Sequence, residues 1–397
     1  MASPPIQTLY FVDGFDLVDY DRAFLKYNGY VQGFNQGSII SGNGGGNAIA
    51  TFNSAFDPVG AQFSRIFGLV STLGIHMDYQ QFGGSSWGAY DWYTVTAGDG
   101  TVILKLHQRI DGLLDVIGPG GLIATTIVPL NLGKWNNLVI LLAFGTSGSV
   151  SIFINGVQGF AVAAEPCNFG TDPPDRAQFF WDAGFGPPGI ALDNYILYDG
   201  LANIGPCHVD SMLPISDSPA TVWIPGATSP DVPSSQCWEM VNDSEGRFPG
   251  EGPDGDFTYV SAVATANQTF QMQRSPCYGV VLGVALNVCG RPLTGFSPQQ
   301  FNFIAILSAG TQSVGTGILV SIGAISTTPQ LADYQTVQAC LPLSPATGQT
   351  WIDAEITNGN FGFGSIEVKQ RITAFNIEKI TSLTPQPFNC GGASYSY

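Results

Sequence analysis

Two carboxylates that could do acid–base chemistry stand close together late in the chain. Asp353 and Glu355 are separated by one residue within the apolar segment 351–356. If this segment is a β-strand, both side chains lie on one face of its sheet. A carboxylic acid and a carboxylate on one face are the acid and nucleophile pair of a retaining glycosidase. We favour the alternative, in which both are solvent-facing strand residues.

The three histidines are the other groups with chemistry near neutral pH. His76, His107 and His208 are far apart in the sequence. The glycines at 44–46 follow Asn43, but the Gly-Lys-Ser/Thr of a phosphate-binding loop does not come after them. These residues therefore predict no catalytic site and no cofactor, and we expect that the protein is not an enzyme.

Oxygen-rich loops offer the kind of ligand that calcium prefers. They surround Asp91, Asp99, Asp111, Asp254 and Asp256. None of these loops has the spacing of an EF-hand. Structural calcium therefore stays open as an option, with the metal ligands unknown.

An aromatic cluster between residues 85 and 94 is denser than usual. Trp87, Tyr90, Trp92 and Tyr93 could stack on the faces of sugar rings if they were exposed. We favour core packing, because large aromatic side chains dominate the interiors of β-sandwiches.

The charge balance excludes one class of partner. The chain has 397 residues, with 13 Lys and Arg against 30 Asp and Glu, which gives a net charge of −17. Nucleic-acid-binding proteins need a basic surface, so we expect no nucleic-acid partner. Charged residues make up only 11% of the chain, less than half of the usual share of about 25%. With 50 Gly, 26 Pro and 12% aromatic residues, the composition indicates a turn-rich, well-packed protein.

The sequence also bears on the compartment. The sequence contains no run of 18 apolar residues, so we expect no membrane-spanning helix. Residues 1–7 lack the features of a signal peptide. We therefore expect synthesis in a cytoplasm. The seven cysteines form no Cys-x-x-Cys pair, which argues against zinc, and we expect them to be buried free thiols.

Short segments that alternate apolar and polar residues recur between Gly, Asn, Asp and Pro, and helix signals are nearly absent. This pattern predicts an all-β protein of antiparallel, jelly-roll-like sandwiches. The expected strands include residues 10–12, 67–70, 101–106, 138–144, 150–154, 157–160, 190–200, 279–286, 303–307 and 317–322. Asn155-Gly156 predicts a tight hairpin turn.

A Pro- and Ser-rich range divides the chain into two predicted sandwiches. The first domain is expected at 1–203 and a linker or long loop at 204–236. The second sandwich is expected at 237–375, and a C-terminal arm at 376–397.

The first domain resembles the laminin-G and concanavalin A-like sandwich. The resemblance rests on Trp135, the apolar run after it and Ile154-Asn155-Gly156, together with a closing strand at 190–200. It implies that Trp135 anchors its strand to the core and that Asn155-Gly156 forms the turn.

The pairing of this domain with the second half is similar to structural proteins of tailed bacteriophages. The matching residues are Trp238, Pro253-Asp254-Gly255-Asp256, Tyr259-Val260, Trp351 and Phe361-Gly362-Phe363. The resemblance implies a non-enzymatic virion component, such as a head-decoration, head-fibre or tail-associated protein. It also implies homo-oligomers, contacts with capsid or tail proteins, and contact with host-surface glycans. The alternatives are a soluble carbohydrate-binding module or lectin and, less favoured, a glucanase-like glycosidase that uses Asp353 and Glu355.

Overall fold

The apolar–polar alternation of the sequence produces strands along most of the chain. In the computed structural model, the residues whose placement is described are 6, 8–14, 29–31, 37–41, 43, 47–51, 62–81, 89–180, 190–218, 223–227, 237–241, 258–262, 267–292, 298–319, 335–365, 370–383, 389–390 and 393–394. The protein is nearly all β, and its antiparallel, jelly-roll-like sheets confirm the predicted fold class. Among the described residues, no helix is long and apolar enough to cross a membrane.

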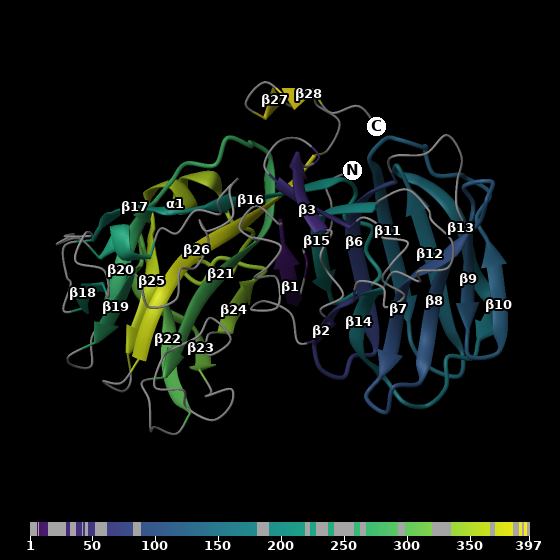
Figure 1. Ribbon diagram of the computed structural model, residues 1–397, viewed down its shortest axis with the longest axis horizontal. Coiled ribbons are helices and arrows are strands. Elements are labelled where there is room, and N and C mark those ends of the chain that lie inside the picture. Colours follow the sequence, from purple (N-terminus) through teal and green to yellow (C-terminus); the bar gives the residue numbers. More distant parts are fainter. Residues whose placement is uncertain are drawn as a thin grey trace. The chain divides into compact units, whose positions relative to one another are not determined.

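The chain divides into two compact units. Unit 1 comprises Met1–Phe15, Tyr27–His208 and Ser382–Tyr397, and unit 2 comprises Asp16–Lys26 and Val209–Thr381. Figure 1 draws the strands of unit 1 mainly in purple to teal and those of unit 2 in green to yellow.

Unit 1 contains an eight-stranded sheet and a seven-stranded sheet. The first is formed by β1 (Leu9–Asp13), β3 (Gly37–Ser41), β4 (Asn47–Thr51), β6 (Thr72–Gln81), β11 (Asn136–Ala143), β12 (Gly148–Ile154), β13 (Val157–Cys167) and β15 (Ile190–Tyr198). The second is formed by β2 (Gly29–Val31), β5 (Gln62–Ile66), β7 (Tyr90–Ala97), β8 (Val102–Gln108), β9 (Leu114–Gly118), β10 (Gly121–Thr125) and β14 (Pro174–Phe180). In the seven-stranded sheet, β7, β8, β9 and β10 are successive neighbours.

Aromatic side chains join the two sheets of unit 1. Tyr79 of β6 stacks on Trp92 of β7 with ring centroids 4.6 Å apart. Phe179 of β14 packs edge-on against Tyr195 of β15 at 4.8 Å. Each strand therefore contributes an inward-facing ring to a shared core, as expected for a sandwich.

Close packing also fixes one glycine in this core. Gly74 of β6 is the register partner of Tyr198 of β15. A Cβ atom added at Gly74 would lie 2.2 Å from the Tyr198 ring. Because real Cβ atoms do not approach rings so closely, the ring occupies the space that any other residue at position 74 would need.

The predicted Asn-Gly hairpin is present. Strands β12 and β13 pair antiparallel, with Ile154 opposite Val157. Asn155 and Gly156 have φ values of 52° and 77°, which is the left-handed backbone that such a two-residue turn requires. The side chain of Asn155 also accepts a hydrogen bond from the Asn137 backbone N–H at 2.9 Å.

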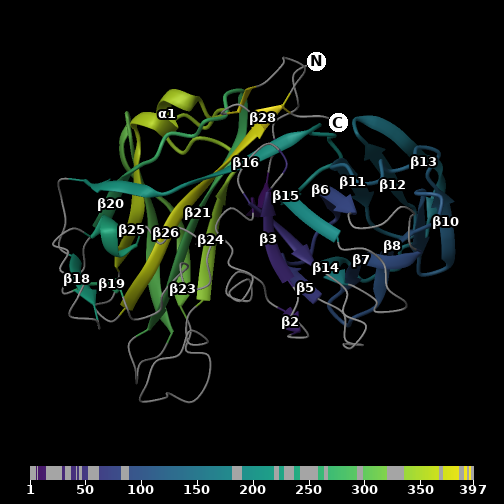
Figure 2. The same cartoon turned by 45° about the horizontal axis from the view of Figure 1, so that its top comes forward.

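Unit 2 contains a six-stranded and a five-stranded sheet. The first is formed by β16 (Cys207–Met212), β18 (Trp223–Ala227), β19 (Thr258–Ala262), β21 (Val280–Pro292), β24 (Gln335–Leu341) and β26 (Gln370–Ser382). The second is formed by β17 (Pro214–Asp217), β20 (Asn267–Met272), β22 (Gln299–Leu307), β23 (Gly310–Leu319) and β25 (Asn360–Ser365). The long strands β21 and β26 lie side by side in both views (Figure 1, Figure 2). Trp223 of β18 packs edge-on against Phe363 of β25 at 4.8 Å, which joins the two sheets.

Three expectations about the chain's organisation need correction. The range 204–236, expected to be a linker or long loop, contributes β16, β17 and β18. The arm expected from residue 376 begins inside β26, where Ile377 and Ile380 are fully buried. At 204–236, strand pairing and apolar burial outweigh the local Pro and Ser signals. Residues 67–70 were expected to be a strand but form a loop, since Gly68 has a φ of 87°.

The cysteine expectation is also wrong in two respects. Cys167, Cys207, Cys237, Cys289 and Cys340 form no disulfide, but Cys340 is only partly buried. Cys277, however, is disulfide-bonded.

Candidate functional site

A fully buried carboxylate lies at the centre of a polar network in unit 1. Asp78 of β6 is 0% exposed. Its Oδ1 accepts a hydrogen bond from Asn137 Nδ2 at 2.9 Å, and its Oδ2 accepts from Asn43 Nδ2 at 3.0 Å and Asn194 Nδ2 at 2.8 Å. Three side-chain amides thus replace the water that this carboxylate loses on folding.

His76 belongs to the same network. Its Nδ1 lies 2.8 Å from the Asn194 carbonyl oxygen, which can only accept, so Nδ1 carries the proton. Its Nε2 then accepts hydrogen bonds from Asn137 Nδ2 at 2.7 Å and from the Cys207 N–H at 3.2 Å. Burial lowers the pKa of His76, although nearby Asp78 opposes this shift. His76 is therefore a neutral, hydrogen-bonded core histidine.

The other buried groups have local partners too. Burial raises the pKa of the Cys207 thiol, and its Sγ donates to the Gly205 carbonyl oxygen at 3.4 Å. His208, in β16, is 5% exposed. Asp210, further along β16, accepts a hydrogen bond from the Ser275 hydroxyl.

The acid pair near the end of the chain does not lie on a strand. Asp353 and Glu355 are in the short helix α1 (Asp353–Asn358), where residues two apart do not share a face. Asp353 pairs with Nζ of the buried Lys379 at 3.2 Å. Glu355 Oε1 accepts from the Ser344 hydroxyl at 3.0 Å, and its Oε2 accepts from the Ile352 N–H at 3.3 Å. The strand placement was wrong because β25, which carries the Phe361 and Phe363 pattern, begins only at Asn360.

The structure confirms core packing for three members of the aromatic cluster. Tyr90 is 5% exposed, and Trp92 and Tyr93 are fully buried. The Tyr93 hydroxyl lies 2.9 Å from the Tyr195 hydroxyl inside the sandwich. These rings are unavailable to a ligand, and Trp87 lies outside the described residues.

The aspartates considered for calcium have separate local roles. Asp99 accepts a hydrogen bond from the Thr101 N–H at 2.8 Å, and this bond lowers the pKa of Asp99. Asp111 pairs with Arg109 at 3.0 Å on the turn after β8. Asp254 and Asp256, like the glycines at 44–46, lie outside the part of the chain that the structure describes.

A row of polar side chains crosses four neighbouring strands of the seven-stranded sheet. Asp91 of β7 is the register partner of His107 of β8, His107 is that of Asp115 of β9, and Asp115 is that of Thr125 of β10. We call Asp91, His107, Asp115 and Thr125 the polar row. Their side chains point away from the core, because the intervening Leu106 and Val116 are fully buried.

Ion pairs and hydrogen bonds hold the polar row in place. Asp91 Oδ1 lies 2.7 Å from His107 Nδ1, and its Oδ2 lies 2.8 Å from Lys105 Nζ. The Thr125 hydroxyl donates to Asp115 Oδ1 at 2.6 Å. The Asp91, Lys105 and His107 side chains are 24%, 30% and 31% exposed, so solvent reaches them.

One serine pattern precedes this row in the sequence. Residues 84–88 have the spacing Gly-x-Ser-x-Gly and lie outside the described residues. A nucleophile elbow of this spacing joins a strand to a helix, whereas this segment lies between β6 and β7.

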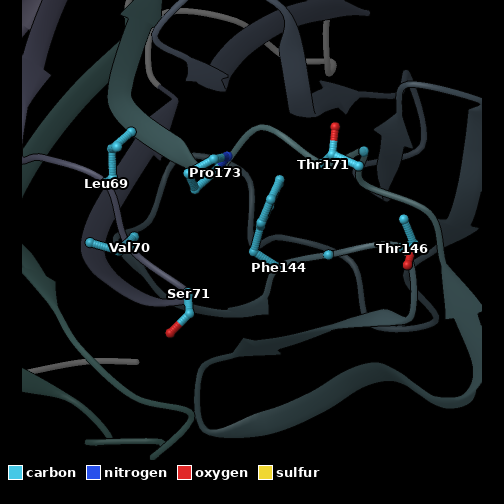
Figure 3. A pocket seen from close by; sticks show the side chains of 9 residues that line it. Leu69, Val70, Ser71, Phe144, Thr146, Thr171 and Pro173 are labelled. Carbon is cyan, nitrogen blue, oxygen red and sulfur yellow. The ribbon is translucent and has the colours of Figure 1, made fainter.

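Three loops of unit 1 border an open hollow of about 580 Å³, which we call the end groove. It is lined by Leu69, Val70, Ser71, Phe144, Gly145, Thr146, Gly170, Thr171 and Pro173. In Figure 3, Phe144 stands near the centre, with Leu69 and Val70 on one side and Thr146 and Thr171 on the other. Its lining combines apolar surface with three hydroxyl groups and has no ionisable side chain.

Each loop of the end groove contains a glycine in the left-handed region. Gly68, beside the groove, and Gly145 and Gly170 in its lining have φ values of 87°, 126° and 89°. Other residues rarely adopt this backbone, so the glycines fix the course of the three loops. The hollow could not be predicted from the sequence, because the three loops are far apart along the chain.

Comparison with known proteins gives fold-level likeness alone. No family model and no curated protein matches the sequence. Among solved structures, the cellulose-induced protein Cip1 has 14% identity and a TM-score of 0.38 over 48% of this chain and 97% of its own. Endo-β-1,4-glucuronan lyase from the fungus Trichoderma reesei has 10% identity and a TM-score of 0.35 over 44% and 93%. Alginate lyase vAL-1 from Chlorella virus has 11% identity and a TM-score of 0.36 over 50% and 100%.

Proposed function

We propose that this chain is a non-enzymatic structural component of a tailed-phage virion that contacts carbohydrate on a host surface. The observation that carries the carbohydrate contact is the end groove. Its uncharged lining suits a ligand with one apolar face and several hydroxyl groups, such as a sugar ring. A site with no ionisable side chain offers contact rather than acid–base catalysis.

The roles of the remaining polar groups support a non-enzymatic function. His76 and Asp78 are buried and hydrogen-bonded within the core. Asp353 pairs with Lys379, and Glu355 is engaged at the start of α1. A glycosidase needs two carboxyl groups that flank a substrate, and the geometry of this helix does not supply that arrangement.

The virion role rests on the resemblance of the two-domain sequence to phage structural proteins. The low charged fraction of 11% supports it, because the cores of protein interfaces are depleted of charged residues. Head decoration, head fibre and tail-associated protein are the candidate locations, with homo-oligomers and capsid or tail proteins as partners. On this proposal the protein is made in the host cytoplasm and carried in the virion.

Quantitative mass spectrometry of density-banded particles tests the virion role. We expect the chain at a fixed ratio to the most abundant shell protein. A large ratio indicates a decoration protein, and a few to a few dozen copies indicate a tail or vertex fibre. Absence from the particles overturns the virion role and leaves the second candidate, a soluble carbohydrate-binding protein, which the end groove also supports.

A panel of neutral glycans tests the carbohydrate contact with the full chain. We expect binding that Phe144→Ser weakens about tenfold, because the substitution removes the aromatic surface of the groove. Tyr278→Ser is the matched control, since Tyr278 is an aromatic side chain that is 67% exposed and does not line the groove. Equal binding by both variants contradicts the role of the groove. Release of reducing ends that is lost in Glu355→Gln or His107→Gln contradicts a non-enzymatic function.

A further inference from the structure

The polar row has a regular spacing that an isolated ion pair lacks. Adjacent strands lie about 4.8 Å apart, so side chains in register on four neighbouring strands span about 14 Å. Asp91, His107, Asp115 and Thr125 therefore form a continuous row that runs across the strands. An extended polymer lying across the strands would meet one polar side chain at each step.

The side chains of the polar row are held in position but keep hydrogen-bonding capacity. Each carboxylate oxygen of Asp91 accepts one bond, although it can accept two. Lys105 uses one of its three ammonium hydrogens on Asp91. His107 Nε2 makes no hydrogen bond to the described residues. A ligand therefore finds acceptors and donors that are already oriented, which lowers the entropic cost of binding.

The charges of this region select the kind of ligand. Asp91, Asp111 and Asp115 bring three negative charges, and Lys105 and Arg109 bring two positive charges. The whole chain carries a net charge of −17, so it repels polyanions such as acidic polysaccharides. Sugar hydroxyl groups both donate and accept hydrogen bonds, so a neutral saccharide can bind to side chains of either charge.

Exposed ion pairs on a sheet face are common, contribute little to stability and usually have no binding role. This region differs because a chain with only 11% charged residues places Asp91, Lys105, His107, Arg109 and Asp115 on adjacent strands and their connecting turn. Close by, the turn after β8 exposes Ile110 and the loop after β10 exposes Ile127, at 73% and 80%. These side chains offer apolar surface for the ring faces of a sugar chain.

We propose that the polar row binds an uncharged, extended oligosaccharide that lies across β7, β8, β9 and β10, with successive sugar units over successive strands. This inference rests on the carbohydrate contact of the proposed function and adds a second site to the end groove. The groove accommodates a single ring or a chain end, whereas the row binds the length of a chain.

Titration calorimetry of the full chain with a length series tests this inference. The probes are cello-oligosaccharides and manno-oligosaccharides of one to six units, with oligogalacturonates as acidic counterparts. We expect the affinity to rise about tenfold or more from two to four units and then to level off, because four units cover the row. Binding should change little with salt, since no net charge is neutralised.

Substitutions distinguish ligand binding at the polar row from ligand binding at the end groove. We expect Asp91→Ala and Asp115→Ala each to lower the affinity for the four-unit ligand about tenfold, and to remove the length dependence. Asp99→Ala is the matched control, because Asp99 is an exposed aspartate on the turn between β7 and β8. Unfolding midpoints of all variants show whether the fold is retained.

Five outcomes overturn the inference. Affinity that does not depend on length, or equal losses for Asp91→Ala and Asp99→Ala, excludes the row as the site. Tighter binding of oligogalacturonates excludes a neutral ligand. Binding that only Phe144→Ser weakens leaves the proposed carbohydrate contact intact but removes the row, whereas no binding of any probe overturns both.

Discussion

Two histidine–aspartate regions of unit 1 use the same residue types in opposite ways. His76 and Asp78 are fully buried, and amide groups of asparagines surround them. His107 and Asp91 are about one-quarter to one-third exposed and pair with each other, and Asp91 also pairs with Lys105. The comparison teaches that burial, rather than residue type, decides whether such a pair stabilises the fold or remains available to a ligand.

The largest expected effect is the removal of the buried carboxylate. Asp78→Ala leaves the amide donors of Asn43, Asn137 and Asn194 without their acceptor. We expect the free energy of unfolding to fall by about 3 kcal/mol or more, because each unsatisfied buried donor costs about 1–3 kcal/mol. Urea unfolding followed by circular dichroism measures it. A loss below about 1 kcal/mol would show that water replaces the carboxylate.

A second, smaller effect depends on pH. The pKa of His76 is lowered in the folded protein, so below pH about 6.5 the unfolded chain takes up a proton that the folded chain does not. We expect the stability contributed by His76 to be present at pH 7 and to be lost as the pH falls, by up to about 1.4 kcal/mol per pH unit.

Comparison with a variant that lacks His76 separates this effect on stability from the titration of the carboxylates. Urea unfolding of the wild type and of His76→Gln is compared at pH 7 and pH 5, with Asp78 and Cys207 unchanged beside the histidine. The variant should be less stable at pH 7, and the difference should shrink at pH 5. Parallel curves for the wild type and His76→Gln would refute the assignment.

The smallest expected effect is at the exposed pair. Asp91→Ala leaves Lys105 and His107 in contact with solvent, so they regain water in place of the carboxylate. We expect the free energy of unfolding to change by less than about 1 kcal/mol. The same urea experiment measures it beside Asp78→Ala. An equally large loss for the two variants would erase the distinction between the two regions.

Local sequence signals predicted the fold well where short-range chemistry decides it. Asn155-Gly156 predicted the hairpin between β12 and β13, because few residues adopt its left-handed backbone. The secondary structure of residues 351–363 was harder to predict. The two-residue separation of Asp353 and Glu355 fits a strand, but the segment that contains them is a helix. The contact of Asp353 with Lys379, 26 residues away, is likewise invisible in this spacing.

The polar sites depended on long-range pairing and could not be predicted from spacing. Asp78 and Asn194 are 116 residues apart, and their contact requires β6 and β15 to be neighbours. The polar row likewise needs the register of four strands. A His and an Asp in an apolar strand, such as His76 and Asp78, can indicate a buried polar network. The sequence alone does not distinguish this buried pair from the exposed pair of Asp91 and His107.

The close approach of Gly74 and Tyr198 has an evolutionary consequence. With the aromatic ring 2.2 Å from the site of a missing Cβ, neither position can change freely while the other keeps its residue. Related chains should therefore retain glycine at the first position wherever a large ring occupies the second. Where the ring has been replaced by a small side chain, alanine or serine becomes admissible at the first position, and the two substitutions should be inherited together.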